Sequence, residues 1–412
     1  RWTEDAMVRR ARRALEGPAR WLRPLVREVL ATYPRPPADR PRELAAYVEI
    51  VLGEPAFGAP PPPRVRRHPV GFTPRMARMP WPVPAIPTLG ALSDFLDTNA
   101  ATLEWLADAR GLEHRAADER LRNYRYTWVA RRSGPPRLIE APKARLKVLQ
   151  RRVLREILAH IPPHDAAHGF VAGRSARSHA ARHAGRAVVL CLDLEDFFVS
   201  VAPGRLFGVL RTAGYPEAVA HGLTALCTNA TPVDVVAAAP FTLRRRLAHT
   251  HLPQGAPTSP ALANLVAFAL DRRLAGLAAR AGATYSRYAD DLTFSGGPRV
   301  HASLAWLRAN VERIVRDEGF RLNTSKTRYM TAAGRQHVTG IVVNVHPNVA
   351  REEYDALKAL LHEAERRGLA AANRANVPDL RAHVLGRISW IGALNAARGA
   401  RLRERFDRIA WE

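Results

Sequence analysis

Three aspartates at the ends of apolar segments constrain the fold of this chain more than any other feature. Residues 187–192 (AVVLCL) form a short apolar run rich in branched side chains, which predicts a buried strand that ends at Asp193. Residues 285–295 (YSRYADDLTFS) contain two strand-like arms around the adjacent acids Asp290 and Asp291. This pattern favours a β-hairpin that presents acids at its turn. The fold must therefore accommodate three carboxylates beside buried strands.

Carboxylates in such surroundings are costly unless cations compensate their charge. Two magnesium ions about 3.5 to 4 Å apart are a common compensation, and such ions activate a hydroxyl group and stabilise a leaving group. A single Asp at a strand end is most often a turn or cap residue. Together, however, Asp193, Asp290 and Asp291 predict a catalytic centre that binds two Mg²⁺ ions.

The charge balance indicates a polyanionic partner. The 412 residues include 63 Lys and Arg against 38 Asp and Glu, which gives a net charge of +25. Nucleic acid is the usual partner for an excess of this size, although an arginine-rich composition spread over a solvated surface would give the same total. A chain of this length is long enough for two or three packed units.

Cysteine content and hydropathy indicate the cellular compartment. Cys191 and Cys227 are too few for a disulfide framework and lack the paired spacing of a zinc site, so a reducing environment is expected. No apolar run approaches the roughly 18 residues that span a bilayer, and the basic N-terminus lacks the apolar core of a signal peptide. We therefore expect a soluble, cytoplasmic protein with no membrane partner.

Residues 1–88 predict a basic, helical and proline-rich extension. Apolar residues recur at helical spacing from Trp21 to Leu30, after a cluster of arginines at 9–13. Prolines are dense in residues 34–87, which disfavours continuous helix and predicts a linker or an extended arm.

Two more elements follow from local patterns. Residues 126–139 predict a hairpin with Gly134 and Pro135 in its middle. Ser259 is suited to cap a helix, and apolar residues at three- and four-residue steps continue that helix to Leu277.

The acid motifs resemble those of a known enzyme family. Residues 288–291 (YADD) look like the tyrosine-x-Asp-Asp box of reverse transcriptases, and residues 190–198 (LCLDLEDFF) resemble the family motif that carries the first aspartate. Both lie in the expected order along the chain. The resemblance implies that Asp193, Asp290 and Asp291 bind the two magnesium ions of a template-copying polymerase.

Two downstream motifs extend this resemblance. Residues 252–265 (LPQGAPTSPALANL) are similar to the segment that lies beside the template base and the incoming nucleotide, which implies nucleotide contacts for Gln254 and Gly255. Residues 319–326 (GFRLNTSK) match the family's lysine motif. There Lys326 would lie near the pyrophosphate, where an ammonium group can act as general acid.

Two further residues are assigned to the nucleotide by the same resemblance. Residues 137–142 (RLIEAP) look like the fingers motif, whose basic residues clamp triphosphate oxygens, and Arg137 is the assigned residue. Phe198 falls where the family has a bulky ring under the sugar of the incoming nucleotide, and a 2′-hydroxyl would collide with that ring. Either Phe197 or Phe198 is expected to be an ordinary core aromatic, and we assign the gate to Phe198.

Three features narrow the resemblance to the retron reverse transcriptases of bacteria. Residues 336–344 (QHVTGIVVN) contain the Val-Thr-Gly triplet typical of that group, at the primer-grip hairpin. Residues 167–183 (AHGFVAGRSARSHAARH) resemble the group's insertion before the first aspartate, which often reads Asn-Ala-x-x-His, with His179 here in place of Asn. Few residues follow the helical segment 386–391, so we expect a short thumb and not the maturase and endonuclease regions of a group II intron protein.

Primer and template contacts are expected from this triplet and from the basic C-terminal segment, whose apolar residues at helical spacing leave arginines free to face a nucleic-acid backbone. The residues assigned to primer and template are Val338, Thr339, Gly340, Arg398, Arg401 and Arg403.

The expected fold is α+β, a right-hand polymerase with fingers, an antiparallel palm and a short helical thumb. The extension at 1–88 would precede fingers with the retron-type insertion at 89–186, a palm with the catalytic acids at 187–335, and a primer grip and helical thumb at 336–412.

The expected function is RNA-directed DNA synthesis from deoxynucleoside triphosphates. The retron resemblance implies a dedicated, structured noncoding RNA as template and primer, and a branched RNA–DNA product (msDNA). It also implies a role in phage defence, in which an effector protein is a possible further partner. Another bacterial reverse transcriptase, of the diversity-generating or abortive-infection type, would leave no 2′,5′ branch. A catalytically idle nucleic-acid-binding scaffold would have no physical reason to keep three acids and Lys326.

Overall fold

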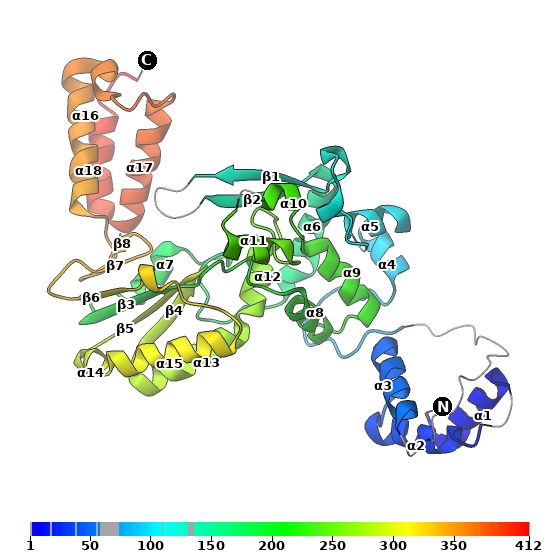
Figure 1. The fold of residues 1–412 in the computed structure, drawn as a ribbon. Helices are drawn as coiled ribbons and strands as arrows, with labels where there is room; N and C mark the ends of the chain where they lie inside the picture. Colours follow the sequence, from blue (N-terminus) through cyan, green and yellow to red (C-terminus); the bar gives the residue numbers. More distant parts are fainter. Residues whose placement is uncertain are drawn as a thin grey trace. The chain divides into compact units, whose positions relative to one another are not determined.

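A computed structural model describes the two compact units into which the chain divides (Figure 1). One unit comprises Arg1–Pro162 and Val201–Leu262, and the other comprises Pro163–Ser200 and Ala263–Glu412. The described residues are 2–16, 19–37, 39–54, 57, 74–108, 110–130, 136–237 and 239–411. The prolines at 60–63, and Gly134 and Pro135 of the predicted hairpin turn, lie outside the described residues.

The first unit begins with three helices, α1 (Glu4–Ala14), α2 (Leu22–Thr32) and α3 (Pro41–Gly53). Their apolar faces pack on one another, with Leu25 and Val29 of α2 buried against Val51 of α3. The helical pattern before Leu30 is thus confirmed. The expectation that the proline-rich stretch lacks helix is wrong for α3, because Pro41 occupies the first helical turn, where its missing N–H removes no hydrogen bond.

Residues 74–87 form an arm that contains neither helix nor strand. The arm packs on the rest of the first unit, where the Ala77 amide donates to the Gly214 carbonyl at 2.8 Å. The predicted hairpin is confirmed: β1 (Tyr124–Val129) and β2 (Arg137–Pro142) pair antiparallel, with Val129 opposite Arg137. The helices around it are α4 (Leu89–Phe95), α5 (Ala100–Leu106), α6 (Ala144–Glu156), α8 (Pro203–Thr212), α9 (Glu217–Cys227), α10 (Val233–Val236) and α11 (Phe241–Ala248).

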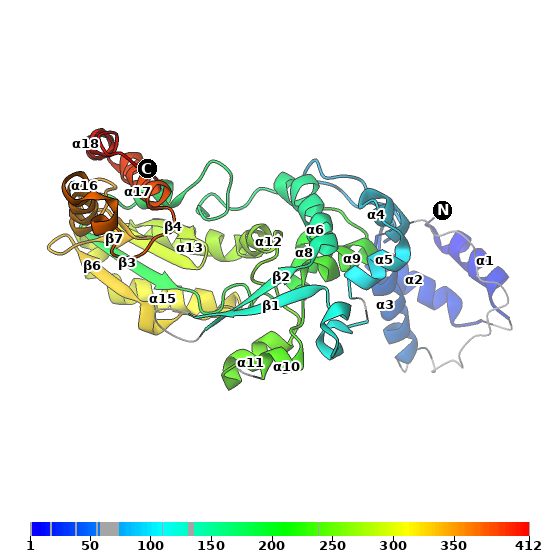
Figure 2. The ribbon, with the colours of Figure 1, turned by 90° about the horizontal axis from the view of Figure 1, so that it is seen from above.

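The second unit contains an antiparallel four-stranded sheet in the order β4-β5-β3-β6. Its strands are β3 (Val188–Asp193), β4 (Thr284–Tyr288), β5 (Asp291–Gly296) and β6 (Arg328–Thr331). Every residue of β3 is buried, as the apolar run predicts for a central strand. Helix α13 (Phe268–Ala281) packs against β4 and against α15 (Leu304–Asp317), and these helices lie along the sheet in Figures 1 and 2.

The helix predicted from Ser259 to Leu277 is divided in two. Helix α12 (Ser259–Val266) ends before Ala267, whose ψ of 1° departs from helical geometry, and α13 begins at Phe268. The described part of the second unit also holds α7 (Ala176–Ala181) and α14 (Pro298–Ala302).

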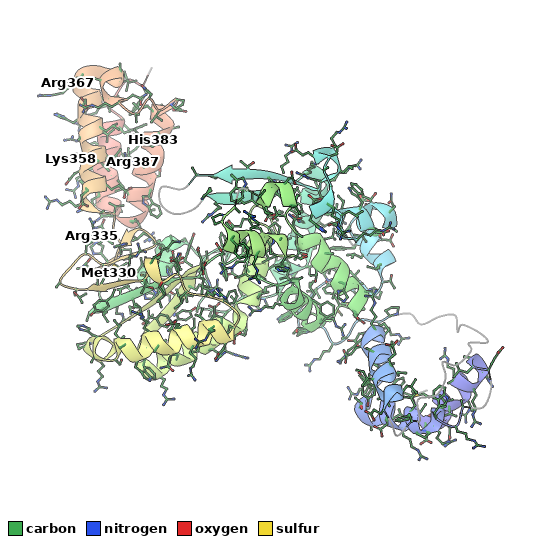
Figure 3. The ribbon with its side chains drawn as sticks, in the orientation of Figure 1. Met330, Arg335, Lys358, Arg367, His383 and Arg387 are labelled. Carbon is green, nitrogen blue, oxygen red and sulfur yellow. The ribbon has the colours of Figure 1, made fainter. Side chains whose placement is uncertain are left out.

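Three helices, α16 (Arg351–Ala372), α17 (Leu380–Leu394) and α18 (Ala396–Phe406), form a C-terminal bundle. A short hairpin of β7 (His337–Val338) and β8 (Ile341–Val342) precedes it. The bundle carries basic side chains, among which Lys358 and Arg367 extend from α16 and Arg387 from α17 (Figure 3).

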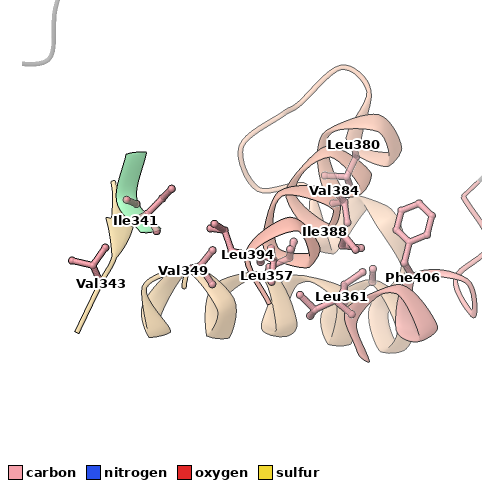
Figure 4. Packing of buried hydrophobic residues seen from close by; sticks show 14 of the residues in the cluster. Ile341, Val343, Val349, Leu357, Leu361, Leu380, Val384, Ile388, Leu394 and Phe406 are labelled. Atoms are coloured by element: carbon pink, nitrogen blue, oxygen red, sulfur yellow. The ribbon is translucent and has the colours of Figure 1, made fainter. Parts of the chain in front are cut away.

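The core of the bundle is continuous with the sheet. Leu357 and Leu361 of α16 pack with Val384 and Ile388 of α17 (Figure 4), and the same cluster includes Val189 of β3. The apolar spacing of the C-terminal segment therefore serves packing, as expected. Mixed helix and antiparallel sheet confirm the α+β class.

Candidate active site

The sheet brings the first and last of the three predicted acids together. Strands β3 and β5 pair so that Asp193 lies opposite Asp291. Asp290 lies beside them in a two-residue turn between Tyr288 and Asp291, and the Leu194 amide donates to its carbonyl oxygen at 2.9 Å. Ala289 takes a positive φ of 55°, which matches the backbone that two-residue hairpin turns require. The hairpin predicted from the two strand-like arms around the acids is therefore confirmed.

Burial and neighbouring like charges together determine the electrostatics of this cluster. Burial, followed by the charges of Asp290 and Asp193, raises the pKa of Asp291 to about 6. Lys326 supplies countercharge to Asp193, since its Nζ donates to both carboxylate oxygens at 3.0 Å. The site therefore has an excess of carboxylate that a further cation would relieve.

Carboxylate oxygens are the donors that Mg²⁺ prefers, so the donor set fits the predicted metal. No group of three or more His, Cys, Asp or Glu side chains in the described part of the chain is already arranged around a metal position. Lys326 instead balances part of the charge. The three acids are thus the chemically suitable ligands, although their side chains are not preset as a closed coordination shell.

The two phenylalanines after Asp193 differ in their surroundings. Phe197 is buried, and its ring lies 5.6 Å from that of Phe320 and 5.5 Å from the guanidinium carbon of Arg287. Phe198 is half-buried, with its ring 5.7 Å from Phe197 and 6.1 Å from Phe170. These surroundings suit Phe197 for the core and leave Phe198 accessible.

A fully buried arginine, Arg287, stabilises the hairpin that carries Asp290. Arg287 of β4 donates to both carboxylate oxygens of Asp271 at 2.6 and 2.8 Å, and to the Ala289 carbonyl at 3.0 Å. It also donates to Asn264 at 2.9 Å. Removal of either charged partner would leave a buried, unpaired ion, so this pair fixes the turn that carries Asp290. No sequence pattern pointed to Arg287.

Two histidines from the retron-like insertion contact the same hairpin. His183 bonds the Ser295 and Ser286 hydroxyls through its two ring nitrogens at 2.8 and 2.7 Å. His179, which stands where the family often has Asn, bonds the hydroxyls of Ser286 at 2.9 Å and Thr293 at 3.2 Å. These contacts join α7 and the residues after it to β4 and β5.

The first unit holds the other predicted nucleotide residues. Arg137 is exposed at the start of β2. The Glu140 amide of the same strand donates to the Gln254 carbonyl at 2.8 Å. Gly255 has a φ of 137°, and a Cβ there would lie 2.8 Å from the Glu140 carbonyl oxygen, so only glycine fits. Strand β2 therefore positions the Gln254-Gly255 loop.

A buried ion pair anchors this loop. The Glu140 carboxylate accepts hydrogen bonds from His251 Nε2 at 2.8 Å, Asn229 at 2.9 Å and Thr231 at 2.8 Å. The charge of Glu140 and its hydrogen bond outweigh burial and raise the pKa of His251. Glu140 lies within the RLIEAP motif and His251 directly precedes the LPQG motif, but no pattern assigned either residue a role.

The predicted primer and template residues differ in accessibility. Val338 is fully buried in the core of the second unit, whereas Thr339 and Gly340 form the turn of the β7–β8 hairpin with φ angles of 47° and 80°. Of the three arginines, which lie on α18, Arg398 stacks on Tyr354 at 4.9 Å and Arg403 pairs with Asp407 at 2.8 Å. Arg401 is exposed, and its Nε donates to the Ala397 carbonyl at 3.3 Å.

Within the described ranges, no helix is both long and apolar enough to cross a bilayer.

Comparison with known proteins identifies the family. The profile of the family "Reverse transcriptase (RNA-dependent DNA polymerase)" matches residues 129–360. The retron Mx65 reverse transcriptase of Myxococcus xanthus is 45% identical over 70% of this chain and 65% of its own length. The retron Mx162 reverse transcriptase of the same organism is 39% identical over 67% of this chain and 58% of its own length.

The retron Ec86 reverse transcriptase of Escherichia coli is 34% identical over 58% of this chain and 70% of its own length. The matched region thus spans less than two thirds of the length of the two Myxococcus relatives. These matches confirm the resemblance carried by the acid, lysine and Val-Thr-Gly motifs, and the chain belongs to the reverse transcriptase family as one of its retron-type bacterial members.

Proposed function

We propose that this protein is an RNA-directed DNA polymerase that works with two Mg²⁺ ions. The observation that carries the proposal is the pairing of Asp193 with Asp291 beside Asp290, with Lys326 3.0 Å from Asp193. Such a cluster has the donor type and the excess negative charge that divalent ions complement. Membership of the reverse transcriptase family supports the same chemistry.

In this mechanism Asp193, Asp290 and Asp291 would hold the ions through their carboxylate oxygens. The chemistry that such ions supply when bound is a more acidic primer hydroxyl and charge compensation for the leaving pyrophosphate. Lys326 donates the proton that the pyrophosphate takes as it leaves. Its ammonium group is half-exposed, so the side chain has room to exchange Asp193 for a phosphate oxygen.

The remaining assigned residues orient the nucleotide. Arg137 binds triphosphate oxygens, where a planar guanidinium can make two parallel hydrogen bonds. Gln254 and Gly255 line the nascent base pair, and the Glu140–His251 pair keeps their loop in place. Phe198 excludes the 2′-hydroxyl of ribonucleotides, for which its accessible ring is better suited than the buried Phe197.

We also propose a right-hand arrangement, with fingers at 89–186, palm at 187–335, and primer grip and thumb at 336–412. The antiparallel sheet with the acids supports the palm, and the bundle of α16, α17 and α18 supports the thumb. The described part of the proposed extension at 1–88 contains helices α1, α2 and α3 and the arm at 74–87.

The template is proposed to be a structured noncoding RNA, copied in the cytoplasm into a branched RNA–DNA product that acts in phage defence. The names of the relatives, which are retron reverse transcriptases, support this proposal. The net charge of +25 favours a polyanionic partner of this kind.

Sequencing of the nucleic acid that copurifies with the full chain, before and after treatment with a 2′,5′-debranching enzyme, tests the proposal. We expect one RNA species joined to a DNA copy of part of itself, and release of the DNA by debranching. DNA copied from RNA without a branch would instead indicate another class of bacterial reverse transcriptase. Bound RNA with no DNA copy, together with no extension of an annealed primer by the purified protein, would indicate a scaffold.

A further inference from the structure

The segment 166–170 runs along the acid hairpin and is fixed to it. The Arg287 amide donates to the Ala166 carbonyl at 2.7 Å, and the His168 amide donates to the Arg287 carbonyl at 2.7 Å. Ala167 forms a parallel bridge with Arg287, so this segment adds a short strand-like edge to β4. It therefore moves with the hairpin that carries Asp290.

Gly169 brings the segment against the turn itself. A Cβ at Gly169 would lie 2.5 Å from the Ala289 amide nitrogen, so the two backbones pack with no space for a side chain. The Gly169 carbonyl accepts a hydrogen bond from Asn264 Nδ2 at 2.8 Å, and Asn264 also accepts from Arg287. The residue that follows Gly169 thus leaves this edge from a defined position beside Ala289.

That residue, Phe170, has a strained backbone and an exposed ring. Its φ is 61°, a region of strained backbone that bulky residues rarely adopt. In the described ranges it is the only aromatic residue with a positive φ; the other non-glycine residues with one are Asp97, Asp108, Asp196, Ala289, Thr339 and Asn376. The Phe170 side chain is 52% exposed, so burial of the ring offsets little of this strain.

The strained conformation of Phe170 places its ring in contact with the ring of Phe198. Phe170 lies 6.1 Å from Phe198 between ring centroids, with the planes inclined by 58°, which is a favourable geometry for two aromatic rings. The Phe198 ring is also 5.7 Å from the ring of the buried Phe197. Phe198 therefore has two aromatic neighbours, one ring in the core and one exposed ring.

We propose that Phe170 is a second specificity-determining residue for 2′-deoxynucleoside triphosphates, which acts by holding the ring of Phe198 in place. Without Phe170, the Phe198 ring gains rotational freedom on its open side and can turn away from a 2′-hydroxyl. This inference rests on the proposed function, because it assumes that Phe198 faces the sugar. Because Phe170 lies in the retron-like insertion, this insertion would have a role in substrate selection.

The decisive measurement is the ratio of kcat/KM for a deoxynucleotide to that for the matching ribonucleotide, on an annealed RNA template and DNA primer. Phe170→Gly removes the ring and relieves the positive φ, so the variant keeps the backbone without added strain. Phe268→Ala is the matched control, since it removes another partly exposed ring of the second unit that packs on His164. Phe198→Ala tests the gate itself.

We expect Phe170→Gly to lower the ratio roughly tenfold or more, since a lost steric contact in a pocket is worth about 10- to 200-fold in discrimination, while Phe268→Ala leaves it unchanged. The double variant Phe170→Gly/Phe198→Ala should discriminate no worse than Phe198→Ala alone, because Phe170 acts through Phe198. A merely structural residue would lower both kcat/KM values together and leave their ratio intact.

An unchanged ratio in Phe170→Gly, with a lowered ratio in Phe198→Ala, would overturn the role of Phe170 and leave the proposed gate standing. Additive losses in the double variant would overturn the action through Phe198. If neither variant changes the ratio, the gate assignment fails together with this inference. If the parent protein extends no primer on RNA, the proposed function fails first.

Discussion

At the scale of single residues, hydrogen-bond partners decide whether a buried histidine is charged or neutral. His251 Nδ1 faces the His249 carbonyl and Nε2 faces the Glu140 carboxylate; both partners accept, so both nitrogens must donate and the ring is an imidazolium. Both ring nitrogens of His183 face serine hydroxyls, which can donate or accept, so a neutral ring is satisfied. His251 and His183 are similarly buried, so the chemistry of the hydrogen-bond partners decides the charge of each ring.

This difference predicts how stability depends on pH. Burial, then the charge of Arg182, lowers the pKa of His183 to about 3, below the value near 6.5 of an unfolded chain. Between these values the unfolded chain binds more protons, so the free energy of unfolding falls as pH falls, by up to about 1.4 kcal/mol per pH unit for this one group. His168 and His179 have lowered pKa values and add to the same trend. His251, with its raised pKa, instead loses its stabilisation as pH rises above about 6.5.

We therefore expect His183→Gln to flatten the pH dependence of stability below about pH 6.5, by up to one proton equivalent. Urea unfolding curves recorded by circular dichroism across that range would measure the slope. His362→Gln, which removes an exposed histidine of α16, is the control. Equal slopes in His183→Gln and the parent would show that His183 is protonated in the folded protein.

The second residue-scale prediction concerns the acids. Asp290→Asn should reduce primer extension to background while RNA affinity stays near that of the parent, because an amide has the shape of the acid but is a poor magnesium ligand. Asp317→Asn removes an acid of α15 that pairs with Arg273 and should leave extension unchanged. Extension assays with purified proteins, with a parallel filter-binding assay, separate the two effects. Substantial extension by Asp290→Asn would remove Asp290 from the metal site.

At the scale of elements, strands and the acid hairpin were predictable because a buried central strand and a two-residue turn leave strong local signals. The Glu140–His251 pair was not predictable, since its residues are 111 positions apart in the sequence. The Arg287–Asp271 pair, whose residues are 16 positions apart, was not predictable either. The burial of both pairs depends on the finished fold. The role of the retron-like insertion was likewise hidden, because His183 and Phe170 act through contacts with distant strands and rings.

The element-scale prediction concerns the close crossing of α17 and α18. Gly392 and Gly399 face each other there, and a Cβ at Gly399 would overlap the Gly392 backbone. Gly399→Ala should destabilise the protein by about 1 to 3 kcal/mol, since the helices must move apart. Gly386→Ala in α17 meets nothing within 4 Å and should stabilise the protein by about 0.5 to 1 kcal/mol through helix propensity. Urea unfolding would reveal the opposite signs, and equal effects would mean that the crossing tolerates a wider spacing.

At the scale of the whole molecule, the net charge of +25 favours the proposed binding of nucleic acid, and intramolecular pairs decide which charges can contribute to it. Arg403 already has Asp407 as a partner, and Arg398 stacks on Tyr354, so a neighbour already engages part of each guanidinium group. Arg401 is exposed on α18, and its Nε donates to the backbone carbonyl of Ala397 at 3.3 Å. The three arginines, which look alike in the sequence, are thus unequal.

The last prediction follows from this inequality. If α18 binds the RNA backbone, Arg401→Ala should flatten the slope of log affinity against log salt by about 0.7 to 0.9, the value for one phosphate contact. Arg403→Ala on the same helix is the matched comparison and should flatten it less, because its guanidinium is already neutralised by Asp407. The triple variant Arg398→Ala/Arg401→Ala/Arg403→Ala sets the upper limit, roughly two to three units. Titrations of the copurifying RNA at several salt concentrations give these slopes. Unchanged slopes in all three variants would mean that these arginines only solvate the helix, and template binding would then rest on other basic surfaces, such as the arginines of α1.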